Sequence, residues 1–201
     1  MFNTIEFSVP KLLKINTELI SFCCGHDEQD TDLNNFLLND AKIYLEEIFA
    51  KTLIWYDNNE IIAYASVSND SVKIEKDKVS DKLGDNEPPF SSFPAVKIGR
   101  LAVTENYQGK KFGQKIMDFF KLFFLIRNKT GCRFIIVDAY LKAIDFYKKN
   151  GFIFLSNSDK SNQHTRKMFF DLKVHLDNLK KFDDFSKIEE IFIKNFSNFI
   201  I

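Results

Sequence analysis

A segment near the middle of the chain, KIGRLAVTENYQGKKFG (97–113), contains the residue types and spacing that most directly indicate chemistry. An apolar run over 98–103 is followed by a polar turn, a glycine-bearing loop and a predicted helix. Such an arrangement presents backbone N–H groups to a phosphate, and the helix dipole favours an anion at the same place. Lys110, Lys111 and Lys115 add side-chain charge. The segment therefore predicts a site for a phosphorylated cofactor.

Two common phosphate-binding loops do not fit this segment. Its spacing is not Gly-x-x-x-x-Gly-Lys-Ser/Thr, so the sequence disfavours a nucleoside triphosphatase. The spacing is not Gly-x-Gly-x-x-Gly either, and no strand places an acidic residue at the distance that a dinucleotide's ribose needs. A third type of pyrophosphate loop, Gln/Arg-x-x-Gly-x-Gly/Ala, remains, and residues 108–113 fit it at Gln108 and Gly113 but have Lys111 at its first glycine.

Hydrophobic periodicity predicts the elements that must position this loop. A helical face over 33–50 follows Asp30-Thr31-Asp32, which supplies the predicted N-terminal cap. Two β-rich runs, 52–57 and 61–68, are separated by asparagines that favour a hairpin turn. The other predicted elements are an N-terminal strand and turn through Ile15, an exposed loop over 70–95, strands over 96–103 and 132–140, a helix over 113–130 ended by Gly131, a short helix over 141–150 stopped by Gly151, and strands over 152–155 and 165–172.

This order of elements predicts an α/β (α+β) domain with a mixed, mostly antiparallel central sheet flanked by helices. We expect the domain to span residues 1–172 and a C-terminal amphipathic helical extension to span 173–201. The apolar residues of the tail follow helical spacing. They are Ile188, Ile191, Phe192, Phe196, Phe199 and Ile200. This face either packs on the domain's own surface or makes a contact with a partner or in a homodimer.

Charge is distributed unevenly along the chain, although the formal net charge is zero. Residues 97–149 contain 12 Lys and Arg against 4 Asp and Glu, whereas the remainder contains 16 against 24. A basic middle third suits an anionic ligand, and the alternative is that the two parts pair with each other. The neutral total argues against a dedicated nucleic-acid binder.

Cysteines, histidines and apolar runs indicate no further site. Cys23, Cys24 and Cys132 form neither a disulfide framework nor a metal-ligand spacing, so we predict no metal and a reducing compartment. His26, His164 and His175 lie far from the central segment in sequence. The N-terminus lacks a signal-peptide pattern and FFKLFFLI is too short to span a bilayer, so we expect a cytoplasmic protein without membrane contact.

The chain resembles the GNAT N-acetyltransferase superfamily over roughly residues 5–172. Its QGKKFG loop resembles the family's acetyl-CoA loop, and FYKKNGF, about thirty-five residues further on, resembles the family's FYxxxGF ending. The resemblance implies acetyl-CoA as cosubstrate and an amine as acceptor. It implies a GNAT-like sheet in which one strand's backbone holds the pantetheine and polarises the thioester. The cofactor-binding residues it implies are Leu101, Ala102, Val103, Gln108, Gly109, Lys110, Lys111, Phe112, Gly113 and Gln114.

The resemblance also assigns the catalytic step. It implies direct attack of an amine on the thioester in a ternary complex, an oxyanion stabilised by a backbone N–H such as that of Val103, and protonation of the departing CoA sulfur by Tyr147. The alternative is that Tyr147 only packs against neighbouring rings. Asp138, at the end of a strand, is a candidate base through water, or a salt-bridging group.

Two positions depart from the family pattern. Lys111 occupies a position that is usually glycine, which matters if the backbone there needs a positive φ. Leu141 stands where many relatives have a polar asparagine, so one side-chain hydrogen bond near the active site is in doubt.

Three functions follow from these observations. The first is an acetyl-CoA-dependent N-acetyltransferase acting on a primary amine. The second comes from FCCGHDEQDTDLNNFLLNDA, IIAYASVSND and PAVKIGRLAV, which resemble a GNAT subgroup that includes toxins acetylating aminoacyl-tRNA. For that acceptor the predicted basic groove consists of Arg100, Arg133, Lys142, Lys148 and Lys149. The third is a catalytically weak acyl-CoA-binding or interaction module, which the two departures keep open.

Overall fold

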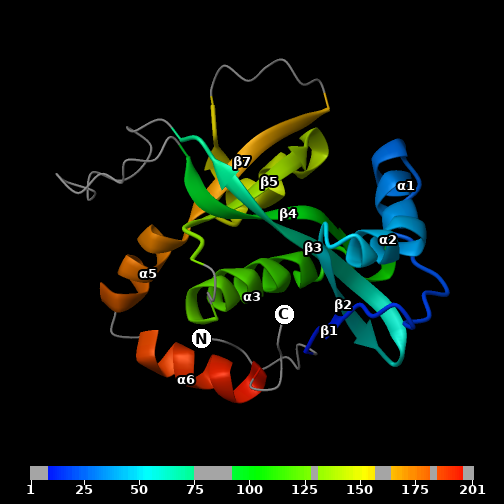
Figure 1. Cartoon of the computed structure of the whole chain (residues 1–201), viewed down its shortest axis with the longest axis horizontal. Coiled ribbons are helices and arrows are strands. Elements are labelled where there is room, and N and C mark those ends of the chain that lie inside the picture. The colour runs from blue at the N-terminus through cyan, green and yellow to red at the C-terminus, as the bar shows by residue number, and fades with distance from the viewer. Residues whose placement is uncertain (1–8, 75–91, 128–130, 157–163, 182–184, 197–201) are drawn as a thin grey trace. The chain divides into compact units, whose positions relative to one another are not determined.

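The computed structural model describes residues 9–74, 92–127, 131–156, 164–181 and 185–196. Seven strands form one sheet in the order β1-β2-β3-β4-β5-β7-β6 (Figure 1). The strands are β1 (Lys11–Leu12), β2 (Lys51–Asp57), β3 (Glu60–Val72), β4 (Phe93–Val103), β5 (Phe134–Tyr140), β6 (Ile153–Phe154) and β7 (Thr165–Asp171). The helices are α1 (Glu28–Asn35), α2 (Ala41–Glu46), α3 (Phe112–Ile126), α4 (Ile144–Lys149), α5 (Leu172–Lys181) and α6 (Phe185–Phe196). Short helical turns cover Glu105–Tyr107 and Leu141–Ala143, and a π-helical turn, Phe36–Asp40, joins α1 to α2.

The sheet is mixed and mostly antiparallel, which confirms the predicted fold class. Strands β1 with β2, β2 with β3, β5 with β7, and β6 with β7 are antiparallel. Strand β4 pairs with β5 in parallel, and this ladder joins Ala95, Val96 and Lys97 to residues 134–136. Among the described residues the β4–β5 pairing ends at Lys97, although β4 extends to Val103.

The described residues divide into two compact units. The first comprises residues up to Ser68, Ile98–Phe119 and the residues from Ile191, and the second comprises the described parts of Asn69–Lys97 and Phe120–Glu190. Elements β3, β4, α3 and α6 each contribute residues to both units. The predicted boundary at residue 172 stays a prediction.

The core of the first unit contains a group of aromatic side chains among aliphatic ones. Tyr64 is buried on β3, where its ring stacks on Phe36 and its hydroxyl donates to the carbonyl of Leu33 (2.7 Å). Trp55 on β2 packs edge-on against Phe119 of α3 at 5.9 Å between ring centroids. Phe119 also contacts Phe192 (6.0 Å), which is buried on α6. Part of the apolar face of the C-terminal helix is therefore covered within the chain, as one of the two predicted alternatives requires.

The second unit has its own apolar core. It is formed by buried residues of β3, β4, β5 and β7 together with Ile74, which follows β3: Val72, Ile74, Ala95, Phe134, Ile136 and Phe169. The ring of Phe134 contacts those of Phe93 and Phe169 edge-on at 5.7 Å each. At the start of α5, the carboxylate of Asp171 accepts the backbone N–H of Lys173 (2.8 Å) and two donors from the Arg133 guanidinium. This pair joins the beginning of β5 to the end of β7.

Several predicted boundaries were wrong. The N-terminal cap is Asp27, whose carboxylate accepts the N–H of Asp30 (2.8 Å), and the predicted single helix is three segments that begin at Glu28. The predicted loop over 70–95 was too long, because the polar residues after Ser68 still belong to β3 and β4 already begins at Phe93. The residues between those two strands that the structure does not describe, 75–91, fall inside that prediction.

Other ends also differ. Helix α3 begins at Phe112 and ends at Ile126, so Gly131 does not terminate it. The first strand is only Lys11–Leu12, and the described part of the predicted helical extension over 173–201 contains two helices, α5 and α6. The hairpin is confirmed, with Asn58 at φ 45° and Asn59 at φ 68° in its turn. The short helix α4 is also confirmed, and Gly151 follows it at φ 83°.

Candidate functional site

The predicted cofactor loop joins β4 to α3 through two residues in the left-handed region. Gly109 has φ 72° and Lys111 has φ 61°. Left-handed residues placed this way turn successive N–H groups toward one side, which is the nest geometry that binds anions. The first bond into the helix runs from the N–H of Lys115 to the carbonyl of Lys111 (3.1 Å). The N–H groups of the first turn have no partner inside a helix, so the start of α3 is suited to a phosphate.

The backbone conformation of Lys111 is the one for which the family pattern usually has glycine. The position that is usually glycine does have a positive φ, so the lysine sits in a conformation that costs an L-residue roughly 1–2 kcal/mol. Its side chain is exposed, so no packing offsets this cost. The departure is therefore one of backbone strain, and the geometry of the loop is retained.

Gln108 holds the loop through hydrogen bonds of its side chain and backbone. Its side-chain Nε2 donates to the carbonyl of Cys24 (2.6 Å) and to that of Val103 (2.9 Å). Its backbone N–H donates to the carbonyls of Thr104 and Glu105, at 3.2 Å each. Both kinds of donor are directed at the protein, so the geometry supports a positioning role for Gln108 and leaves phosphate contacts to the residues that follow.

Two aromatic rings, those of Tyr107 and Phe112, contact each other at the loop and lie beside two of its lysines. The Tyr107 ring contacts that of Phe112 edge-on at 5.8 Å, and the ammonium groups of Lys110 and Lys115 lie over these two rings, respectively. The hydroxyl of Tyr107 donates to the carboxylate of Asp57, and this hydrogen bond is the main reason why its pKa is raised. The two lysines are thus held beside the loop, where their charge adds to that of the backbone donors.

Tyr147, the predicted acid, is a buried residue of α4 in the second unit. Its ring packs edge-on against Phe146 (5.1 Å) and Phe152 (5.4 Å), and burial raises the pKa of its hydroxyl. The carbonyl of Tyr147 accepts the N–H groups of Asn150 (3.0 Å) and Phe152 (3.0 Å), which closes the turn at Gly151. The FYKKNGF motif therefore fixes the backbone around this tyrosine, whose hydroxyl is protonated at neutral pH.

Comparison with known families identifies the fold that carries these features. The model of the acetyltransferase (GNAT) domain matches residues 49–154, from the start of the β2–β3 hairpin to the end of β6. The chain belongs to the GNAT acetyltransferase family. A search of curated proteins found none that matches the chain.

Solved structures with the same GNAT fold include bacterial toxins. A structure described as a bacterial toxin is 26% identical, with a TM-score of 0.64, and the match covers 86% of this chain and 97% of that one. AtaT complexed with acetyl-methionyl-tRNAfMet is 22% identical with a TM-score of 0.65, and 83% and 95% of the two chains are covered. A tyrosine-to-phenylalanine mutant of AtaT, bound to acetyl-CoA and to the C-terminus of the antitoxin AtaR, is 20% identical with a TM-score of 0.61, over 83% and 94%.

Several charged residues of this GNAT domain form salt bridges within the chain. Asp138, the candidate base, lies 2.6 Å from Lys97 Nζ and 3.8 Å from Lys167 Nζ, so it is a salt-bridging group in the second unit. In the first unit, Arg100 pairs with Asp32 (3.4 Å) and lies over the ring of Phe36. Arg133 likewise has an acidic partner, Asp171, so the charge of both arginines is partly offset within the chain, and the predicted basic groove stays a prediction. Lys142, Lys148 and Lys149 of the same predicted groove are exposed.

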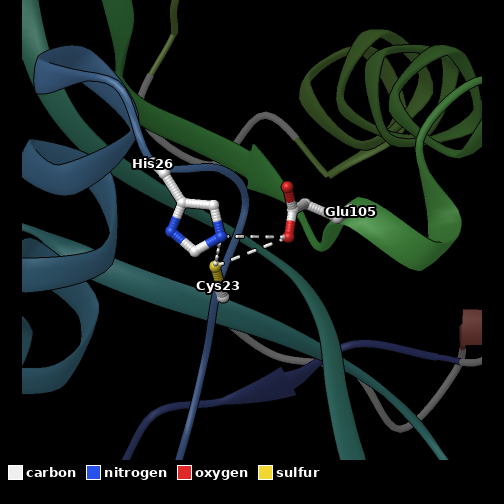
Figure 2. A group of neighbouring side chains, drawn as sticks. All are labelled: Cys23, His26 and Glu105. Atoms are coloured by element: carbon white, nitrogen blue, oxygen red, sulfur yellow. Dashed lines mark hydrogen bonds and ion pairs between the residues drawn. The ribbon is translucent and has the colours of Figure 1, made fainter.

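The GNAT strand–loop–helix segment has a neighbour that the sequence analysis missed. His26 was set aside because it lies far from the segment in sequence, yet its Nε2 is 3.7 Å from Glu105 Oε2, two residues beyond β4 (Figure 2). Cys23 Sγ lies 3.7 Å from the same oxygen. The Cys-x-x-His spacing was the only signal in the sequence, because 82 positions separate Cys23 from Glu105.

The structure also bears on membrane contact. Among the helices of the described ranges, none is long and apolar enough to cross a membrane.

Proposed function

We propose that this GNAT domain transfers the acetyl group of acetyl-CoA to a primary amine, and that the amine is the α-amine of aminoacyl-tRNA. The observation that carries the cofactor assignment is the β4–α3 connection. Its left-handed Gly109 and Lys111 turn the loop into the N-terminus of a 15-residue helix. This geometry suits the pyrophosphate of CoA, and Lys110 and Lys115 supply positive charge beside it.

The cofactor's parts are matched to successive segments of the chain. Backbone N–H groups of the loop and of the start of α3 bind the phosphates: those of Gly109, Lys110, Lys111, Phe112, Gly113 and Gln114. Gln108 positions this loop through its bonds to Cys24 and Val103. The backbone of Leu101, Ala102 and Val103 binds the pantetheine, and this role is supported by the end of the β4–β5 pairing at Lys97.

Tyr147 acts as the general acid. The amine nitrogen attacks the thioester carbon, the carbon–sulfur bond breaks, and the departing sulfur takes the proton of the Tyr147 hydroxyl, which is restored from solvent. The attacking nitrogen loses its proton to water. A tyrosine hydroxyl is protonated at neutral pH, so it carries a proton to donate, and burial raises the pKa of Tyr147 further, which makes it a weaker acid than a free tyrosine.

An α-amine suits this site better than a lysine side chain. Among the described residues the candidate base is Asp138, and its carboxylate is paired with two lysines. This pairing makes Asp138 a poor proton acceptor, so we assign no strong base to the reaction. An α-amine has an unperturbed pKa near 7.7–8.0 and a lysine near 10.4, so the former needs less help to lose its proton. Aminoacyl-tRNA is favoured among α-amines because AtaT, which shares the fold, was solved with an acetylated aminoacyl-tRNA, and because exposed Lys142, Lys148 and Lys149 suit a phosphate backbone.

The first test is acetyl-CoA binding by calorimetry. We expect the wild-type chain to bind and Gly113→Trp to lose binding, because the indole occupies the start of α3. Lys187→Trp is the matched control, since it adds the same side chain at an exposed position of α6 and should bind as wild type does. Absence of binding by the wild-type chain would refute the cofactor assignment and favour the interaction module.

The second test addresses the acceptor alone. Radiolabelled acetyl-CoA is offered with charged tRNA, with the same tRNA uncharged, and with a peptide bearing a free N-terminus. Label on charged tRNA that is lost on mild deacylation supports the proposal. Label on the peptide with none on charged tRNA would refute this acceptor and leave the acetyltransferase reading intact.

A further inference from the structure

Three side chains of the first unit point their donor atoms at one another. Cys23 Sγ lies 3.9 Å from His26 Nε2 and 3.7 Å from Glu105 Oε2, and the histidine and glutamate atoms are 3.7 Å apart (Figure 2). The three donor atoms thus form a nearly equilateral triangle. The side chains of His26 and Glu105 are 83% and 52% exposed, so a solute can reach the triangle from solvent.

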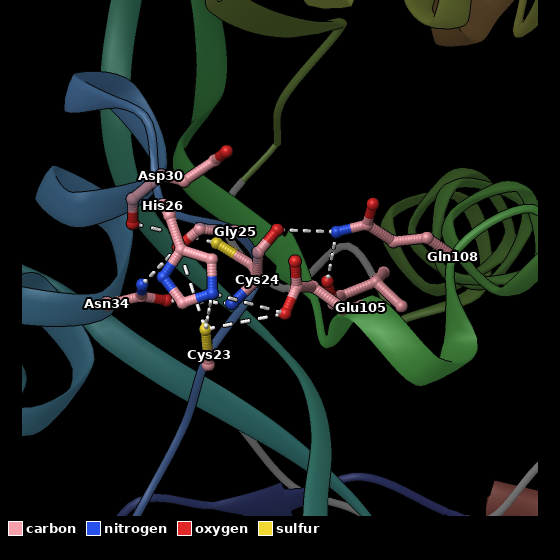
Figure 3. Close-up of polar contacts among 9 residues, drawn as sticks. Cys23, Cys24, Gly25, His26, Asp30, Asn34, Glu105 and Gln108 are labelled. Atoms are coloured by element: carbon pink, nitrogen blue, oxygen red, sulfur yellow. Dashed lines mark hydrogen bonds and ion pairs between the residues drawn. The ribbon is translucent and has the colours of Figure 1, made fainter.

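The backbone that carries these side chains is fixed by hydrogen bonds. The N–H of Glu105 donates to the carbonyl of Cys23 (3.2 Å), which ties the two chain segments together directly. Gln108 Nε2 holds the next carbonyl, that of Cys24 (Figure 3).

The loop is also tied to α1. Asn34 Oδ1 accepts the N–H of Cys24 (2.9 Å), and Asn34 Nδ2 donates to the carbonyl of Gly25 (3.0 Å). Gly25 has φ 144°, and a Cβ there would lie 2.2 Å from Asp30 Oδ2, so the close turn needs glycine. The backbone from which the three side chains extend is therefore ordered before any ligand arrives.

The arrangement does not suit a nucleophile–histidine–acid relay. Such a relay needs the nucleophile on one ring nitrogen and the carboxylate on the other, so that a proton passes through the imidazole. Here the thiol and the carboxylate both face Nε2, and the other ring nitrogen points away from them (Figure 2). Convergence of three donors on one point is the requirement of a cation.

We propose that Cys23, His26 and Glu105 bind a zinc ion. Thiolate, imidazole and carboxylate together select a borderline-soft d-block cation over Mg²⁺ or Ca²⁺, which prefer oxygen. Around tetrahedral zinc the donor atoms are roughly 3.3–3.6 Å apart, so each observed separation needs to shorten by only about 0.2–0.4 Å. Three protein ligands leave the fourth position to water.

Zinc at this site would act as a brace beside the cofactor loop. It would join the loop that precedes α1 to Glu105, which begins the helical turn that leads into Gln108. That link is the one already made by the bond from the N–H of Glu105 to Cys23, so the ion would strengthen an existing contact. This proposal does not depend on the acceptor or on catalysis.

The experiment is a titration of the tag-free, full-length chain with Co²⁺ in a thiol-free reducing buffer. We expect one equivalent to give a thiolate-to-cobalt band in the near ultraviolet and tetrahedral bands in the visible range, all displaced by Zn²⁺ and unaffected by Mg²⁺. Cys23→Ser should abolish the thiolate band. His26→Ala and Glu105→Gln should each weaken binding at least about 10-fold, the lower limit for losing even an indirect partner of a metal.

Cys132→Ser is the matched control, because it removes a partly exposed thiol in the second unit and should leave the spectrum unchanged. Circular dichroism confirms that each variant is folded, which is expected for changes at the surface. Absence of a thiolate band in the wild-type chain would overturn the proposal, and so would a band that persists in Cys23→Ser. A cluster held only by hydrogen bonds would also give no rise in melting temperature with Zn²⁺.

Discussion

Replacing Lys111 by glycine should stabilise the chain, although the substitution removes a charged residue from the proposed cofactor loop. Lys111 has φ 61°, a conformation that costs an L-residue roughly 1–2 kcal/mol. Glycine removes this cost but loses roughly 0.5–1 kcal/mol more conformational entropy on folding. The exposed side chain contributes no buried surface, so the net gain lies between about 0 and 1.5 kcal/mol, with a middle value of about 0.75 kcal/mol. For a chain of this size the middle value corresponds to a rise in melting temperature of about 1.5–3 °C.

Thermal unfolding followed by circular dichroism, in the absence of acetyl-CoA, measures this shift against two controls. Lys110→Gly changes the neighbouring residue, whose φ is not positive, and removes an ammonium that lies over Tyr107, so it should lower the melting temperature. Lys111→Ala keeps a Cβ in the left-handed conformation and should give no gain. A fall with Lys111→Gly equal to that with Lys110→Gly would refute the argument, because it would mean that Lys111 is not strained.

Three further predictions follow from the buried groups. Tyr147→Phe should lower acetyl transfer by roughly 10²-fold with acetyl-CoA affinity retained, and unchanged turnover in steady-state assays would remove the acid assignment. Burial raises the pKa of Tyr147 above its usual 10.0, so as the pH rises the unfolded chain loses this proton before the folded chain does. The free energy of unfolding, measured with urea, should therefore fall as the pH rises above about 10. The fall should be less steep in Tyr147→Phe. Arg133→Met should lower the free energy of unfolding by about 3 kcal/mol and the melting temperature by roughly 6–12 °C. The reason is that the Asp171 carboxylate stays buried with only backbone donors. A loss below about 1 kcal/mol would show that the pair is not effectively buried.

Local chemistry explains which parts of the fold the sequence predicts. The β2–β3 hairpin and the end of α4 depend on residues that favour left-handed turns, Asn58, Asn59 and Gly151, and such signals act over a few positions. The strand–loop–helix segment is equally local, since apolar periodicity and glycine spacing define it. Helix ends were predicted less well, because capping depends on which of several acidic residues has the right geometry, and Asp27 has it where Asp30 and Asp32 do not.

Contacts between distant segments explain what the sequence did not predict. Nothing in the sequence around Arg133 indicates that its guanidinium is paired with Asp171, 38 positions later. The same holds for Cys23 and Glu105, which are brought together by the meeting of two loops. For Lys111 the sequence predicted strain only if the backbone at that position has a positive φ. A sequence pattern gives the usual residue at a position but not the φ of the residue that replaces it.

The β4–α3 connection divides into two halves with different tasks. In the first half, donors are used inside the protein: the N–H of Thr104 bonds to Ile62, that of Glu105 to Cys23, and the amide of Gln108 to Cys24. In the second half, from Gly109 onward, the backbone turns through two left-handed residues into the start of α3. A loop ordered by its own protein loses little further entropy when an anion binds, so more of the interaction energy appears as affinity. Bracing by residues of the N-terminal loop is therefore part of how this GNAT domain would hold its cofactor, although none of those residues needs to touch it.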